Sequence, residues 1–218
     1  MLLNKGAYYY MDTFERKVWH WGEIGKTHLP DLPRGDAVEY NPYWNTQYKD
    51  MVERSRAQLA AMARAGEICR QNQAMGVRHS SDFKIIDSIT ALITHTAHTY
   101  LALSMVENSI GEANRRHFVS HAASYAAFEK AAGSIEVNLK ERDQVFNGLV
   151  AVWEKTRLPK GLSTPDKKLF YQQDRARHYA NRRPDMTYLI YDEQRLGLED
   201  YLKNLREYMA WYKKAYLE

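Results

Sequence analysis

Four histidines, in two pairs at helical spacing, are the residues best suited to chemistry. His95 and His98 are three residues apart, and His117 and His121 are four residues apart. Either spacing places both imidazoles of a pair on one face of an α-helix. Two such pairs on adjacent helices of a bundle could bind a divalent metal ion. These four histidines are therefore the candidate metal ligands.

Other features of the sequence favour separate roles for the histidines. Metal sites inside helical bundles usually include a carboxylate at the Glu-x-x-His spacing, and neither Glu107 nor Glu112 falls at that spacing. If the two helices are antiparallel, His117 lies just past the turn between them, whereas His95 lies about four helical turns away from it. We therefore favour individually packed or hydrogen-bonded histidines and keep a shared metal ion as the alternative.

The Asp192-Glu193 dipeptide could in principle serve glycoside hydrolysis. In retaining hydrolases that use the substrate's own acetamido group, an adjacent Asp and Glu act as stabiliser and general acid. Here the pair lies at the expected start of a helix, where the helix dipole favours acidic side chains, and no Gly-rich strand precedes it. We interpret the pair as helix capping and assign no catalytic residue to the chain.

The first 42 residues are rich in aromatic side chains and in helix breakers. Trp19 and Trp21, with Trp44 just beyond this segment, accompany a run of three tyrosines at positions 8–10, and proline and glycine interrupt any long element. Aromatic rings stack on sugars, and they also dominate interfaces between domains. We expect residues 1–42 to be irregular and to pack on a neighbouring domain, with carbohydrate contact as the alternative for the tryptophans.

The bulk composition is that of an ordinary globular protein. The chain has 218 residues, of which 44% are hydrophobic and 27% are charged. No apolar run approaches the ~20 residues that span a bilayer, and the N-terminus has no apolar segment typical of a signal peptide. We therefore expect no contact with a membrane. The single cysteine, Cys69, lies in a helical pattern and is expected to be a buried structural thiol.

The formal net charge of +4 is concentrated in one segment. Residues 155–183 contain nine Lys or Arg residues against Asp166 and Asp174, a local net charge of +7. Such a segment could bind acidic polymers, which makes a basic adaptor a further functional hypothesis. We do not expect nucleic-acid binding, because the chain carries no recognised nucleic-acid motif.

Apolar residues after Pro42 recur at steps of three and four, the pattern of amphipathic helices. The pattern predicts an all-α, antiparallel four-helix bundle over residues 43–218, with a long basic loop before the last helix. The expected helices cover about 48–69, 80–110, 118–153, and from 188 or 192 to the end. Gly76, Gly111 and Pro159 are the expected helix ends.

The same stripes predict the core of the bundle. The side chains expected to be largely buried are Leu103, Phe128, Ile135, Leu139 and Leu205. Arg142 lies on the stripe of Leu139, so we expect it either to pair with a carboxylate or to lie where the helix leaves the bundle.

Three stretches resemble a known family. VWEKTRLPKG (152–161), DRARHYANRRPDMTYLIYDEQRLGLEDYLKNL (174–205) and the opening DTFERKVWHW (12–21) are similar to the C-terminal region of large bacterial family 20 glycoside hydrolases. These are the β-N-acetylhexosaminidase-like proteins of gut Bacteroidetes. The resemblance covers the chain best from residue 152 onward, whereas the preceding helices match only in general character.

The resemblance implies that the chain is a non-catalytic, helical C-terminal domain of such an enzyme, periplasmic or at the cell surface. Its partner would be the catalytic domain of the same parent protein, which it would support, or whose substrate cleft it would line, or it would mediate homodimerisation. The family's His-x-Gly-Gly motif is missing, so no catalytic residue and no cofactor are carried over. A complete catalytic barrel of about 250 residues would not fit. The alternative is a self-standing metal-binding bundle that uses the four histidines.

Overall fold

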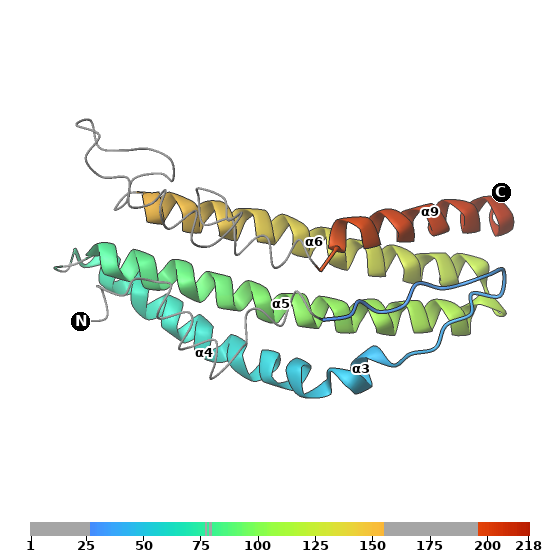
Figure 1. Ribbon diagram of the computed structural model, residues 1–218, viewed down its shortest axis with the longest axis horizontal. Coiled ribbons are helices and arrows are strands. Elements are labelled where there is room, and N and C mark those ends of the chain that lie inside the picture. The colour runs from blue at the N-terminus through green and yellow to red at the C-terminus, as the bar shows by residue number, and fades with distance from the viewer. Residues whose placement is uncertain (1–26, 77, 79, 155–195) are drawn as a thin grey trace, which may run out of the picture. The chain divides into compact units, whose positions relative to one another are not determined.

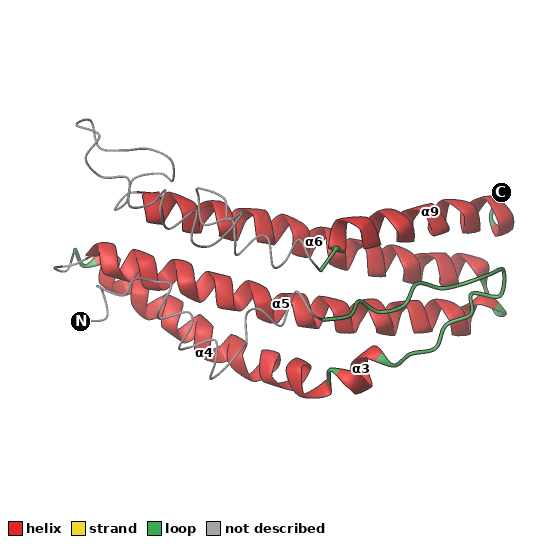
Figure 2. Ribbon diagram, in the orientation of Figure 1, coloured by secondary structure: helices red, strands yellow, loops and turns green. Residues whose placement is uncertain are grey.

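The computed structural model describes residues 27–76, 78, 80–154 and 196–218 (Figure 1). The helices are α3 (Trp44–Gln47), α4 (Lys49–Ala74), α5 (Ser80–His117), α6 (His121–Glu154) and α9 (Leu198–Tyr216). Figure 2 shows helices and loops in this part of the chain and no strand. The predicted all-α helical bundle is confirmed. None of the described helices is long and apolar enough to cross a membrane.

The chain divides into two compact units, and α4, α5 and α6 each contribute to both. Of the described residues, the first unit contains those within 62–93 and 143–154. The second unit contains residues 27–61, 94–142 and 196–218. Most of the largest fully buried side chains, including Trp44, Tyr100, Phe128 and Tyr212, belong to the second unit.

Helix α5 extends beyond its expected end at Gly111 and continues to His117. The expectation was wrong because packing favours continuation: Ala113 and His117 are buried, at 0% and 6% exposure. This burial offsets the cost of about 1 kcal/mol that a glycine imposes on a helix interior. The basic last turn of the helix also complements the helix dipole.

Phe118 was expected to begin the core stripe of the third long helix, and this expectation was wrong. Phe118 and Val119 lie in the turn between α5 and α6, and they are 77% and 79% exposed. Helix α6 begins three residues later because the Ser120 hydroxyl accepts a hydrogen bond from the Ala123 backbone N–H at 3.2 Å. This is the usual role of a serine that caps a helix N-terminus.

Other helix ends follow the sequence more closely. Helix α4 ends just before Gly76, whose φ of +63° suits a glycine in the stop position. Helix α9 begins at Leu198, after Gly197 with a φ of +72°. The predicted helix from 188 or 192 to the end was therefore wrong at its start, because Leu196 and Gly197 are not helical and the left-handed Gly197 interrupts the helix. The basic loop lies outside the described residues.

The predicted core is largely confirmed. Leu103, Phe128, Ile135 and Leu205 are at most 1% exposed, whereas Leu139 is only half-buried. Leu139 lies in a groove between α6 and α9 instead, where it lines a hollow together with Leu202.

The structure also shows the surroundings of Arg142 and Cys69. The Arg142 Nη1 lies 2.5 Å from the Glu199 Oε1, so Arg142 pairs with a carboxylate. Cys69 is buried as predicted. Burial raises the pKa of its thiol, and the nearby Asp87 raises that pKa further while Arg70 opposes the change.

Residues 27–42 contain no helix and pack on the helices of the second unit. The hydroxyls of Tyr208 and Tyr216 donate to the backbone carbonyls of Gly35 and Asp36 at 3.0 and 2.8 Å. Val38 is fully buried and accepts a hydrogen bond from Asn114 through its carbonyl at 2.6 Å. The earlier part of the N-terminal segment lies outside the described residues.

Candidate functional site

The first histidine pair converges on one carboxylate. The Nδ1 atoms of His95 and His98, on α5, lie 3.2 and 2.7 Å from the two carboxylate oxygens of Glu141, on α6. His95 has no exposed surface, whereas the His98 side chain is 42% exposed. Glu141 therefore bridges a buried and a solvent-facing imidazole.

The electrostatics of this group keep Glu141 ionised. Burial raises the pKa of the carboxyl group, but hydrogen bonds from His95 and His98, together with the charge of these rings, lower the pKa below its ordinary value. An ionised carboxylate has no proton to donate, so each Nδ1 carries the proton of its hydrogen bond. The Nε2 of a neutral ring is then its acceptor. This arrangement can orient a histidine as a base or as a metal ligand.

A polar layer continues from this group through the interior of the second unit. The Thr99 hydroxyl lies 3.0 Å from the His95 carbonyl and within hydrogen-bond distance of both polar atoms of the Asn138 amide. Thr99 and Asn138 are buried. Such satisfied polar contacts fix how α5 and α6 align along each other.

Glu141 was not predicted from the sequence, although a signal for it exists. Glu141 follows the turn at 118–120 by about as many residues as His98 precedes it. Residues placed equally far from a turn face each other across two antiparallel helices. Pairing residues by that symmetry, rather than searching for Glu-x-x-His, would have found the carboxylate.

The second histidine pair converges on a tyrosine hydroxyl. His117 ends α5 and His121 begins α6, so the expectation that this pair shares one helix was wrong. Their Nδ1 atoms lie 2.9 and 3.2 Å from the Tyr212 hydroxyl, on α9. Burial lowers the pKa of His117, and the neighbouring His121 lowers it further. One hydroxyl can donate to one neutral imidazole and accept from the other. The His121 ring also stacks on Tyr216, with the ring centroids 4.6 Å apart.

The structure therefore gives the two histidine pairs different partners, Glu141 and Tyr212. Among residues 27–154 and 196–218, apart from the two masked positions 77 and 79, no group of three or more His, Cys, Asp or Glu could hold a metal ion.

Trp44 is an interior anchor. It has no exposed surface, and its indole Nε1 donates to the His28 carbonyl at 2.6 Å. Its ring packs beside Tyr48 and Tyr100. Trp44 therefore offers no face on which a sugar could stack.

Glu107 has a structural role that was not predicted from the sequence. It is buried at 3% exposure. Its two oxygens accept the backbone N–H groups of Tyr43, Trp44 and Asn45 at 2.8, 2.5 and 2.6 Å. Tyr43, the residue before α3, makes no side-chain capping bond. Glu107 thus caps the short helix α3 from α5.

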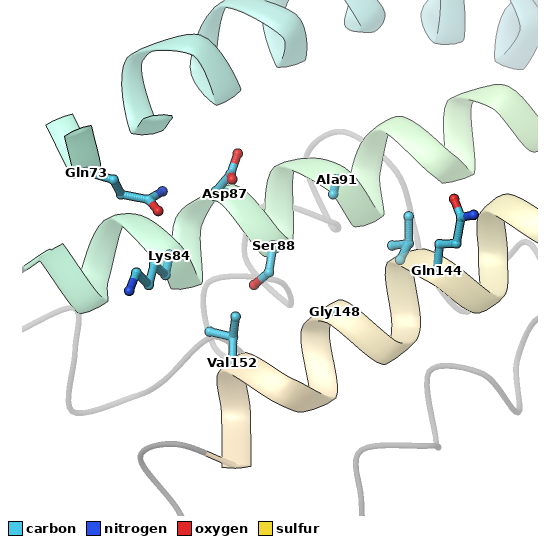
Figure 3. A pocket seen from close by; sticks show the side chains of 9 residues that line it. Gln73, Lys84, Asp87, Ser88, Ala91, Gln144, Gly148 and Val152 are labelled. Carbon is cyan, nitrogen blue, oxygen red and sulfur yellow. The ribbon is translucent and has the colours of Figure 1, made fainter. Parts of the chain in front are cut away.

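A hollow of about 380 Å³ lies within the first unit, lined by residues of α4, α5 and α6. Figure 3 shows Ser88 of α5 and Val152 of α6 pointing toward each other across the space between these helices. Gly148 lies on the wall of the hollow, and a side chain added there would meet no atom within 4 Å. Nothing in the sequence analysis pointed to this hollow.

Several candidate residues lie outside the described residues: Trp19, Trp21, the Asp192-Glu193 pair and the basic segment 155–183. Comparison of the chain with protein-family models, with curated proteins and with solved structures gave no match. What is inferred about function therefore rests on the residues and their geometry.

Proposed function

We propose that this chain is a non-catalytic helical domain of a β-N-acetylhexosaminidase-like glycoside hydrolase, and that it packs on the catalytic barrel. The family is suggested by the resemblance of residues 12–21, 152–161 and 174–205. The non-catalytic role is supported by one observation above all. The best-placed acids and imidazoles of the described residues, Glu107 and Glu141 foremost, are used to join and cap the helices of the bundle itself.

The chemistry of the described carboxylates also favours this role. Hydrolysis assisted by an acetamido group needs an acid whose pKa is raised, beside a second carboxylate that stays ionised. The pKa of Glu141 is lowered instead, and Glu107 accepts three backbone N–H groups. Both carboxylates are therefore suited to structure rather than to proton donation.

The turn between α5 and α6 is the surface we assign to the catalytic domain. Phe118 and Val119 are its highly exposed apolar side chains. The Val119 and Ser120 N–H groups donate to the Arg116 carbonyl at 2.9 and 2.8 Å, and the His117 ring meets Phe118 edge-on. A rigid apolar projection of this kind is typical of an interface, because its burial costs little conformational entropy.

Association with a catalytic barrel tests this proposal. The barrel is taken from a family 20 hydrolase whose C-terminal region carries the same three stretches, and co-elution with the full chain is followed by size-exclusion chromatography. The chain is expected to co-elute, and a Phe118→Ser, Val119→Ser variant is expected to elute alone. Val137→Ser is the matched control, because Val137 is an apolar residue of α6 that is 70% exposed. Separate elution of the unaltered chain and the barrel would contradict the proposal.

A further inference from the structure

We propose that the hollow between α5 and α6 binds a small aliphatic carboxylate. This inference does not depend on the proposed function. The volume of about 380 Å³ is at the lower end of the range for small-molecule sites. The hollow exists because the residues that face it on the two helices, Ser88, Ala91 and Gly148, are small. Side chains of the described residues therefore leave the space open.

Three side chains that line the hollow carry hydrogen-bond donors without a partner among the described residues. The Gln73 Nε2 is buried and has no hydrogen-bond partner in the part of the chain that the structure describes. Lys84 and Gln144 line the same hollow, and their side chains form no ion pair or hydrogen bond with the rest of the described chain. A buried donor without a partner is costly, so a ligand oxygen that accepts from Gln73 would remove that cost.

Two further polar side chains of the hollow have partners within the described chain. The Asp87 Oδ1 lies 3.4 Å from the Arg70 guanidinium, which offsets its negative charge. The Ser88 hydroxyl donates to the Ile85 carbonyl at 2.8 Å. One oxygen of Asp87 is paired with Arg70, whereas the ammonium of Lys84 forms no ion pair with the described residues. An ammonium beside amide donors is a set that recognises a carboxylate.

The aliphatic part of the wall selects the rest of the ligand. Ala91, Val145 and Val152 supply aliphatic surface, and none of the described residues that line the hollow is aromatic. Sugars are usually held by stacking on aromatic rings, which this wall lacks. A short alkyl chain can pack on valine and alanine while its carboxylate reaches Gln73 and Lys84.

Hexanoate is the probe that tests this inference. Its binding to the full chain is measured by ligand-detected NMR titration, with 1-hexanol as the uncharged comparison. We expect saturable binding of hexanoate in the millimolar range, the affinity that a ligand of this size allows. Hexanol is expected to bind about tenfold more weakly, because it lacks the charge that Lys84 recognises. Hexanoate that fails to saturate, or hexanol that binds as tightly, would overturn the inference.

Two pairs of variants locate the binding. Gln73→Leu combined with Lys84→Met is expected to weaken hexanoate binding by about tenfold or more, while Lys203→Met, at an exposed lysine of α9, leaves it unchanged. Gly148→Leu is expected to abolish binding by filling the hollow. Gly133→Leu is its control, because Gly133 is also a glycine of α6 with no neighbouring atom within 4 Å. Equal binding by the Gly148 and Gly133 variants would refute the site.

Discussion

Glu141 shows how a single side chain can join two helices. It accepts hydrogen bonds from a buried histidine, His95, and from an exposed one, His98, and its pKa lies below the ordinary value as a result. Removing its charge would leave the Nδ1 protons of both rings without a full acceptor. The loss in the free energy of unfolding would come mainly from His95, because it is the buried histidine of the two.

We therefore predict that Glu141→Gln lowers the free energy of unfolding by about 1–3 kcal/mol at neutral pH. The measurement is urea denaturation followed by circular dichroism. Glu136→Gln is the matched control, since Glu136 is also on α6 but forms an exposed ion pair with Arg206. The Glu136→Gln variant should lower the free energy of unfolding by at most about 1 kcal/mol. Equal losses for the two variants would show that the histidine contacts contribute nothing specific.

The His117 imidazole allows the sign of a pH dependence to be predicted. Its pKa in the folded chain is lowered from the model-peptide value of 6.5 by burial and by His121. The unfolded chain then binds more protons than the folded chain below about pH 6.5. The stability contributed by the neutral ring is thus fully present above that pH. It is lost as the pH falls toward the folded pKa.

The matching prediction compares the native chain with His117→Gln between about pH 7.5 and 5.5. The free energy of unfolding of the native chain should fall more steeply on acidification than that of the variant. The difference between the two curves isolates His117 from the other histidines. The lowered pKa of His117 would be contradicted if the difference in free energy of unfolding between the native chain and the variant stayed constant with pH, or became smaller at higher pH.

At the scale of elements, α3 depends on a residue far from it in the sequence. Glu107 of α5 accepts three backbone N–H groups at the start of this short helix. A helix of four residues has little stability of its own, so we expect the contact to help hold Trp44 in the core. Long-range capping of this kind leaves no local sequence pattern.

Glu107→Gln should therefore lower the free energy of unfolding by about 1.5–3 kcal/mol, because charge-assisted hydrogen bonds to three donors are lost. Urea denaturation measures the change, and near-ultraviolet circular dichroism reports on the packing of Trp44. Glu112→Gln, at a partly exposed glutamate one turn later on α5, is the comparison. If both variants keep the native stability, the cap is not a stabilising contact.

The long helices are packed to different depths along their length. Phe128 is fully buried between α6 and α9, with its ring near Tyr208 and Tyr212, whereas Leu139 is half-buried in the α6–α9 groove. Phe128→Ala should lower the free energy of unfolding by about 3–5 kcal/mol. Leu139→Ala should lower it by clearly less. Thermal or urea unfolding of both variants checks the order. A larger loss for Leu139→Ala would mean that the burial along α6 is misassigned.

The recurrence of apolar residues at intervals of three and four was enough to predict the helices. It was not enough to predict the contacts between the helices. The stripes of α4, α5, α6 and α9 record which face of each helix is buried, which is why Leu103, Ile135 and Leu205 were predicted correctly. The extension of α5 past Gly111 depends on packing against residues distant in sequence. Glu141 and Tyr212, the partners of the histidines, likewise come from other helices, so spacing within one helix could not reveal them.

At the scale of the whole chain, the described histidines and acids act as connectors. Glu141 joins α5 to α6, Tyr212 joins α9 to the α5–α6 turn, and Glu107 joins α3 to α5. These connections are spread along the second unit rather than gathered at one cleft. A chain built this way is suited to supporting another domain, which is the role we propose.

Turnover of an aryl N-acetyl-β-glucosaminide by the purified full chain tests this role most directly. The account predicts no hydrolysis above that of buffer, with the fold checked by a strongly helical circular dichroism spectrum. The Glu193→Gln variant is measured in parallel, because Asp192-Glu193 is the acid pair that the chemistry would require. Turnover by the native chain that Glu193→Gln abolishes would contradict the account.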